Sequence, residues 1–282
     1  TKAEEIPPEV PPKSLIGQVE STILLASVNT LFFTFILVQL AYLFGGQANI
    51  SAQGFTYAEY ARKGFFELLT VAVVAFGLLW SAERYVEKTE RGHSALFKVL
   101  SSALVLQVIL IMGSAFRRLY LYEQAYGFTM LRLYSHAFTV LLAVIFLILA
   151  YKIIRSASDQ AFALPALVAI IVFLAGLNAL NPDAFIARQN LDRHQDTGKI
   201  DTKYLSRLSD DAVPVLVGGY ASLRPDDTKV LGGELNRRRL EAQSDGGRGW
   251  QSWNLSRATA DKALAVEAPR LQAYPAVKMI KR

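Results

Sequence analysis

Cysteine is absent from this chain of 282 residues, and histidine occurs only three times, as His93, His136 and His194. Without cysteine the chain can form no disulfide framework, thiolate nucleophile or cysteine-ligated metal site. The three histidines are far apart in the sequence and lack the spacing of a metal-binding motif. The sequence therefore predicts neither a metal site nor a cofactor.

Motifs that carry catalysis are also absent. There is no glycine-rich loop that cradles phosphate, no GxSxG elbow and no HExxH helix. The neighbouring acids Asp210 and Asp211, or Asp226 and Asp227, could act as paired carboxylates, but acids at a helix start are also favoured by the helix dipole. The basic residues alternate with Asp and Glu and match no nucleic-acid-binding motif. We therefore predict no catalytic residue and no nucleic-acid partner.

Charged residues are scarce, at 19%, whereas 52% of the residues are hydrophobic. This balance is typical of a membrane protein. Apolar side chains concentrate between Thr22 and Leu180, where about five stretches reach the roughly 20 residues that a helix needs to cross a bilayer. The predicted spans are 23–44, 65–80, 95–116, 133–154 and 161–180.

The predicted fold is all-α and has three parts: a hydrophilic segment at 1–20, a polytopic transmembrane helix bundle at 21–181, and a basic, mostly helical soluble tail at 182–282. Asn181, Asp201 and Ser209 are suited to cap helices of the tail. The first span follows the acidic, proline-rich segment EEIPPEVPP, which differs from a signal peptide. Because the chain begins within that segment without methionine, we expect the protein to continue upstream.

Membrane orientation is nearly balanced, because the loops on the two sides carry similar numbers of lysine and arginine. The loop YVEKTERGHSA is short and charged, as cytoplasmic loops are, whereas GGQANISAQGFTY is longer and uncharged. This contrast predicts an extracytoplasmic tail. The alternative is a basic tail attracted to anionic lipid on the cytoplasmic face.

Polar clusters near the spans gather on the side of the tail, in FTYAEYARKGFFELL, RRLYLYEQAYGFTMLRLYSH and NPDAFIARQNLDR. Alternating tyrosines and arginines suit a pocket for a polar or phosphate-bearing ligand. They equally suit an aromatic belt at the membrane interface. The candidate mouth for a ligand or partner comprises Tyr60, Lys63, Glu67, Arg117, Arg118, Tyr122, Glu123, Tyr126, Arg132 and Arg188.

Glu67 is the one charged residue that we expect clearly within the membrane core. A carboxylate at that depth is costly, so a partner is expected. Arg117 and Arg118 can reach it, and Lys63 lies four residues earlier on the same helical face. The alternative is an interfacial ion pair that only fixes helix packing.

Several segments of the chain are distinctive and read, in order, FTYAEYARKGFFEL, RRLYLYEQAYGFTMLRLY, LNPDAFIARQNLDR, YLSRLSDDAVPVL and WQSWNLSRA. Together they resemble an uncharacterised family of bacterial polytopic membrane proteins, domain of unknown function four-one-seven-three. The resemblance implies a multi-pass protein of the bacterial inner (cytoplasmic) membrane. It implies no reaction, cofactor or catalytic residue.

Two functions remain as hypotheses. The first is a noncatalytic sensor or assembly scaffold, embedded in the lipid bilayer, whose tail docks on the candidate mouth and relays binding of a protein partner or small ligand. The second is a transporter or lipid-handling enzyme that holds an anionic lipid headgroup there. The few charges within the spans and the missing catalytic motifs favour the first hypothesis.

Overall fold

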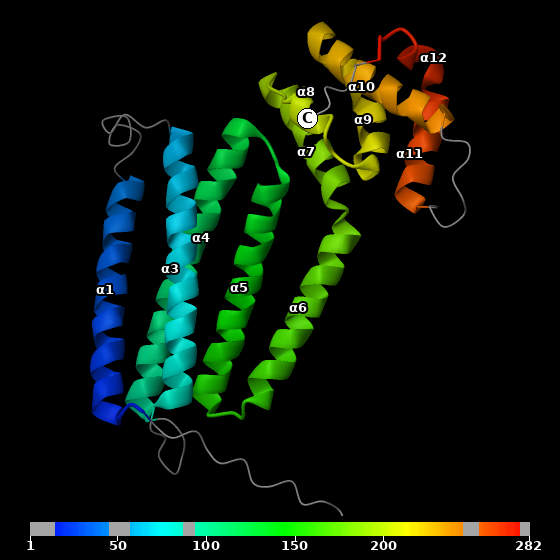
Figure 1. Cartoon of the computed structure of the whole chain (residues 1–282). Coiled ribbons are helices and arrows are strands. Elements are labelled where there is room, and N and C mark those ends of the chain that lie inside the picture. Colours follow the sequence, from blue (N-terminus) through cyan, green and yellow to red (C-terminus); the bar gives the residue numbers. More distant parts are fainter. Residues whose placement is uncertain (1–14, 45–56, 87–93, 245–253, 277–282) are drawn as a thin grey trace, which may run out of the picture. The chain divides into compact units, whose positions relative to one another are not determined.

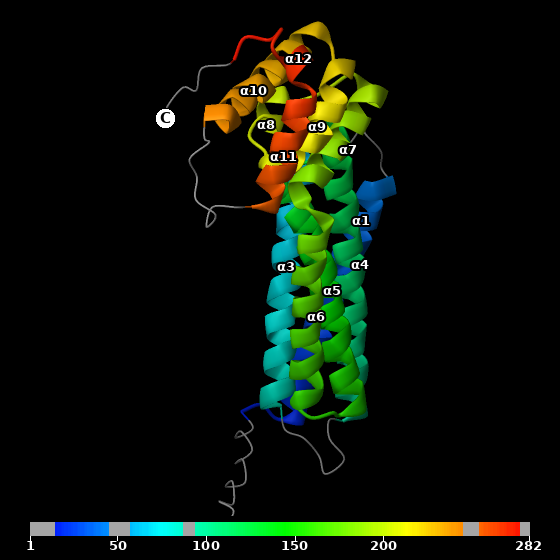
Figure 2. The ribbon, with the colours of Figure 1, turned by 90° about the vertical axis from the view of Figure 1, so that its right-hand side faces the viewer.

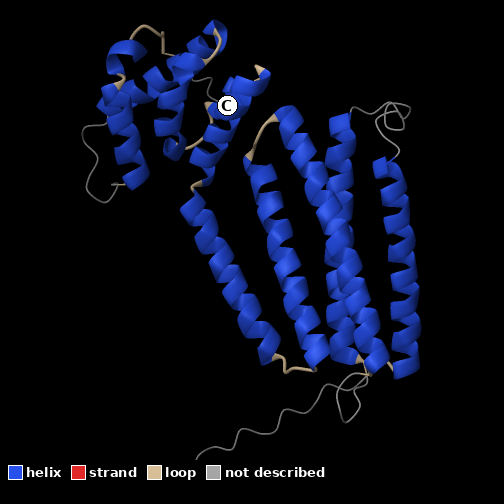
Figure 3. Cartoon of the chain, turned by 180° about the vertical axis from the view of Figure 1, so that it is seen from behind, coloured by secondary structure: helices blue, strands red, loops and turns tan. Residues whose placement is uncertain are grey.

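The structure is a computed structural model that describes residues 15–44, 57–86, 94–244 and 254–276. Within these ranges every regular element is a helix and none is a strand (Figure 3). The predicted all-α fold is thus confirmed. The side chain of Tyr60 lies outside the described part of the chain, as do residues 1–14 of the predicted hydrophilic segment.

Among the described residues, five helices are long and apolar enough to cross a membrane, as predicted: α1 (Gln18–Phe44), α3 (Tyr57–Tyr85), α4 (Ala95–Tyr126), α5 (Met130–Arg155) and α6 (Gln160–Leu180) (Figure 1). The third of them, α4, has 32 residues and is therefore ~48 Å long. It exceeds the hydrocarbon core, which is roughly 30 Å thick.

The chain divides into two compact units, each described here by itself. The first unit comprises Thr1–Leu121 and His136–Val172, and the second comprises Tyr122–Ser135 and Phe173–Arg282. The turn between α4 and α5 thus belongs to the same unit as the C-terminal helices. The predicted boundary at residue 181 separates apolar from polar sequence, whereas the boundary between the units follows packing.

The first unit is held by an apolar core between its helices. Leu25 of α1, Leu79 of α3, Leu104 of α4 and Phe146 of α5 are all fully buried in it. A polar contact joins α1 to α4, because the Asn29 side chain donates to the backbone of Leu100 at 3.0 Å. Such bonds between helices give a partner to a polar donor within a span.

A buried ion pair also joins the helices of the first unit. The Nζ atom of Lys152 lies 2.5 Å from Glu83 Oε2 and 2.5 Å from Asp159 Oδ1. Lys152 is 2% exposed and Glu83 is 3% exposed. Glu83 and Lys152 are thus charged residues buried in the helix packing, which the sequence did not predict, and each neutralises the other. The expected depth of Glu67 in the membrane stays a prediction.

Lys152→Met removes the cation that faces buried Glu83. We expect it to lower the free energy of unfolding by about 3–5 kcal/mol, the usual effect of breaking a buried ion pair. The measurement is detergent-induced unfolding of the purified full chain. Arg155→Met is the matched control, because Arg155 is exposed in the same last turn of α5. Equal losses in the two variants would show that the buried pair contributes no stability.

The second unit contains short or polar helices that follow the last span. They are α7 (Pro182–Thr197), α8 (Thr202–Leu205), η1 (Asp210–Ala212), α9 (Val213–Gly219), η2 (Tyr220–Ser222), α10 (Pro225–Ser244), α11 (Leu255–Val266) and α12 (Ala268–Leu271). In Figure 2 they form one cluster, in which α9 contacts both α7 and α11. Their shared core includes Ile186, Leu216, Leu231 and Leu264.

The helix starts of the second unit test the predicted caps. Asn181 caps α7 by accepting a hydrogen bond from the backbone of Ala184, and Asp201 caps α8 by accepting from Tyr204. Both predictions are confirmed. Ser209 precedes η1 without a side-chain capping bond, so that prediction is wrong. Its backbone N–H donates to Asp183 of α7 at 3.0 Å instead, which links two elements that are distant in sequence.

Tyr220 is the largest fully buried side chain of the second unit, and its hydroxyl donates to Glu267 Oε1 at 3.2 Å. Burial and the neighbouring Glu267 carboxylate raise the pKa of Tyr220 to about 12. An unfolded tyrosine has a pKa of about 10. Because the folded state holds the proton more tightly, this contribution to stability is complete below about pH 10 and is lost as the pH rises through about 12.

Tyr220→Phe removes the group that carries this alkaline dependence. We expect the second unit of the variant to lose less stability than the wild type between about pH 10 and 12. Thermal unfolding followed by circular dichroism at several pH values measures the difference. Tyr126→Phe is the control, since that ring is 54% exposed. Parallel pH profiles for wild type and Tyr220→Phe would contradict the account.

Candidate functional site at the turn between α4 and α5

The turn between α4 and α5 is built around Gly127. Its φ of +82° lies in the left-handed region, which glycine adopts without strain. The backbone N–H of Gly127 donates to Glu123 at 2.7 Å and ends α4. A Cβ atom at this position would collide with the Asn190 side chain. Both the backbone angle and the close approach of α7 therefore require glycine.

Asn190 of α7 pairs with both backbone groups of Phe128, the residue after Gly127. Its Oδ1 accepts from the Phe128 N–H at 3.0 Å, and its Nδ2 donates to the Phe128 carbonyl at 2.9 Å. Nδ2 also donates to Ile186 O within α7 at 2.9 Å. Asn190 is 7% exposed, so these bonds satisfy backbone groups that would otherwise be buried without partners.

Arg193, one turn further along α7, binds the C-terminal end of α4. Its Nε donates to Gln124 O at 2.9 Å and its Nη2 donates to Ala125 O at 2.7 Å. The last carbonyls of a helix have no partner within it and carry partial negative charge, so a guanidinium is well suited to cap them. Burial and the nearby Arg132 lower the pKa of Arg193 from its ordinary 12.5.

Tyr204 of α8 completes the contact from the other side of the turn. Its hydroxyl accepts a hydrogen bond from the Met130 N–H, at the start of α5, at 2.8 Å. Burial raises the pKa of Tyr204, so its phenol stays neutral at physiological pH. Asn190, Arg193 and Tyr204 together form what we term the clamp: three side chains, each of which binds backbone groups of the α4–α5 turn.

The aromatic and basic residues of the candidate mouth meet at this turn in part. The rings of Tyr122 and Tyr126 lie 5.2 Å apart, and the Arg132 guanidinium carbon lies 4.1 Å above the Tyr122 ring. Arg132 also donates to the Gly127 carbonyl. Glu123 is 1% exposed. These side chains therefore make contacts within the turn, and their role in binding a ligand stays a prediction.

The other residues of the candidate mouth lie apart from this cluster. Arg118, in the first unit, donates to the Gln39 side chain and lies against Gly64. Lys63, Glu67 and Arg117 are exposed in the first unit, and Arg188 is exposed on α7 in the second.

Charged and aromatic clusters in the sequence do not predict the clamp. Asn190 and Arg193 lie within the segment NPDAFIARQNLDR, but there Arg188 was the residue selected. Spacing held a usable signal, because positions three apart share one helical face. Their partners are backbone groups, which nearly every residue carries, so the residue types of the turn do not predict these contacts.

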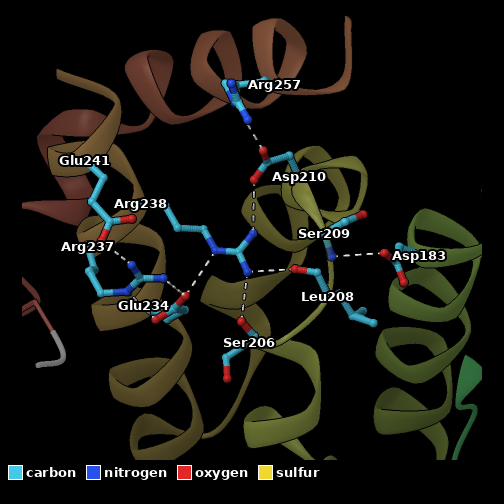
Figure 4. Close-up of polar contacts among 10 residues, drawn as sticks. All are labelled: Asp183, Ser206, Leu208, Ser209, Asp210, Glu234, Arg237, Arg238, Glu241 and Arg257. Carbon is cyan, nitrogen blue, oxygen red and sulfur yellow. Dashed lines mark hydrogen bonds and ion pairs between the residues drawn. The ribbon is translucent and has the colours of Figure 1, made fainter. Parts of the chain in front are cut away.

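A second polar network lies between α10 and the η1 region, and it is structural (Figure 4). Arg238 donates to the backbone of Ser206 at 2.8 Å and of Leu208 at 2.7 Å, and to Glu234 at 3.1 Å. Burial alone would raise the pKa of Glu234, but hydrogen bonds from Arg237 and Arg238 lower it. Glu234 therefore stays ionised and saturated by arginines, which does not suit a general acid or base.

These features are typical of a multi-pass membrane protein: every regular element in the described part of the chain is a helix, five helices are long and apolar enough to span a bilayer, and further helices follow the last of them. The chain belongs to the family described as Domain of unknown function (DUF4153), whose profile matches residues 1–218. A family of unknown function is thus confirmed, but its number is 4153 and not the four-one-seven-three expected from the motifs. No curated protein and no solved structure matches the chain.

Gly127→Ala tests the geometry of the turn. We expect it to destabilise the second unit by at least about 1–2 kcal/mol, because alanine is strained at positive φ and its Cβ meets Asn190. Gly113→Ala is the control: this glycine lies within α4 with open space around it, so alanine should be neutral or stabilising. Thermal unfolding of both variants measures the change in stability. If Gly127→Ala were as stable as the wild type, the close packing of α7 on the turn would be refuted.

Proposed function

We propose that this protein is a noncatalytic membrane sensor or assembly scaffold that couples its C-terminal helices to the α4–α5 turn. The pairing of Asn190 with both backbone groups of Phe128 is the observation that carries the proposal. A partner bound to the C-terminal helices would act on the turn through the clamp. Since binding and conformation are linked, displacement of the turn would in return alter affinity for that partner.

The chemistry of the clamp supports coupling over ligand turnover. Asn190, Arg193 and Tyr204 contact consecutive parts of the turn, from Gln124 to Met130. Backbone contacts transmit a displacement without depending on side-chain rotamers of the turn. Hydrogen bonds of this kind between segments are one physical route by which coupling between separate surfaces is carried.

The arginines support this proposal over the binding of an anionic headgroup. Arg132 and Arg193 donate to backbone carbonyls of the turn, and Arg238 donates to Ser206 and Leu208. Donors already committed to protein acceptors are poorly placed to bind phosphate as well. The alternative of a transporter or lipid-handling enzyme would have to rely on Arg117 and Arg188, which are exposed.

The proposed setting is the inner membrane of a bacterium, with the C-terminal helices on the extracytoplasmic side. The uncharged loop 45–57 and the charged loop 85–95 favour this orientation. The bilayer and a protein partner, or an anionic lipid in the alternative, are the proposed contacts.

Photo-crosslinking in native membranes tests the proposal. A photoreactive residue at exposed Gln195 or Lys203 is expected to yield a discrete protein adduct. Asn190→Ala should greatly reduce the adduct although the protein still inserts, because the turn no longer orders α7. Arg188→Ala, the matched control on the same helix, should retain it. Absence of a discrete adduct at both positions, or loss in the control alone, would overturn the proposal.

A further inference from the structure

A cleft of about 540 Å³ opens within the second unit, where α6 ends. Its apolar wall is formed by Leu174 and Leu177 of α6 with Leu255 of α11. Its polar wall contains Asn178, Asn181, Asp211, Ser256 and Tyr134. The volume is in the range of sites for small molecules. None of the clamp residues lines it, so it is separate from the site described above.

The position of the cleft along the chain places it at the membrane boundary. Leu174 and Asn178 belong to the last span, which ends at Leu180, and Asn181 begins the polar helices. Leu174 is 52% exposed and Leu255 is 68% exposed. One wall therefore adjoins the acyl chains and the other adjoins the headgroup region. An occupant that satisfies both walls is amphiphilic.

The charge of the cleft indicates which polar group of an amphiphile it would bind. Among the described residues that line it, Asp211 is the one acid and none is a lysine or arginine. The neighbouring acid Asp210 is paired with Arg238 and Arg257, at 3.5 and 3.8 Å. Within the described part of the chain, Asp211 has no such partner. A carboxylate without a counter-ion, beside the Ser256 hydroxyl and two amides, favours a headgroup that carries a cationic amine.

We propose that this cleft binds an amine-bearing membrane lipid, with its ammonium group at Asp211 and an acyl chain along Leu174 and Leu177. Asn181, whose Oδ1 accepts from Ala184, keeps its Nδ2 group as a donor for the phosphate of the same lipid. The proposal is independent of the coupling function, because its residues make no contact in the clamp. It also differs from the anionic headgroup expected at the candidate mouth.

The test is native mass spectrometry of the full chain in detergent, titrated with dioleoyl phosphatidylethanolamine or dioleoyl phosphatidylglycerol. The two lipids share chains and phosphate and differ in the amine. We expect the ethanolamine lipid to bind about fivefold more tightly, the ratio typical of a partly exposed charge pair. Asp211→Asn should abolish the preference. Asp192→Asn, exposed on α7, should preserve it.

Two further arms keep the proposal falsifiable if Asp211→Asn perturbs folding. Leu177→Trp fills the apolar wall and should weaken binding of both lipids. Soluble O-phosphoethanolamine should not bind at the same concentrations, because it lacks acyl chains. Equal affinity for the two lipids in the wild type, unchanged binding in Leu177→Trp, or binding of the soluble amine as tight as that of the lipid would overturn the proposal.

Discussion

The structure depends on how the chain satisfies its backbone at the turn between α4 and α5. A helix end leaves carbonyls and N–H groups without partners, and burying them unpaired costs free energy. Here the partners are side chains of another segment: Asn190 for Phe128, and Arg193 for the end of α4. The backbone groups of the turn therefore have these partners only when α7 packs against it.

Helix α7 serves two purposes with successive turns of one face, on which Ile186, Asn190 and Arg193 follow one another. Ile186 and Ala187 are fully buried in the core of the second unit. Asn190 and Arg193 extend to the turn. One rigid helix thus connects the apolar core of the C-terminal helices to the backbone of the turn. This arrangement explains why the turn belongs to the same compact unit as helices that follow more than fifty residues later.

The spans and the caps at Asn181 and Asp201 could be predicted because their signals are local: apolar length, and a side chain that reaches its own helix start. Contacts between distant segments could not be predicted, because they leave no local signal in the sequence. The buried pair of Glu83 and Lys152 joins residues 69 positions apart, which no local pattern connects. The contact of Ser209 also joins distant segments, because its backbone N–H donates to Asp183 of α7.

The most direct test of the central claim is the distance between the turn and α7 in a lipid bilayer. Because the chain has no cysteine, spin labels can be placed at Gln124→Cys and Gln195→Cys alone. Pulsed electron paramagnetic resonance in nanodiscs should give one narrow distribution of distances between the two labels. Asn190→Ala should broaden this distribution. A broad distribution in the otherwise unaltered protein, or one unaffected by Asn190→Ala, would contradict the attachment of the C-terminal helices to the turn.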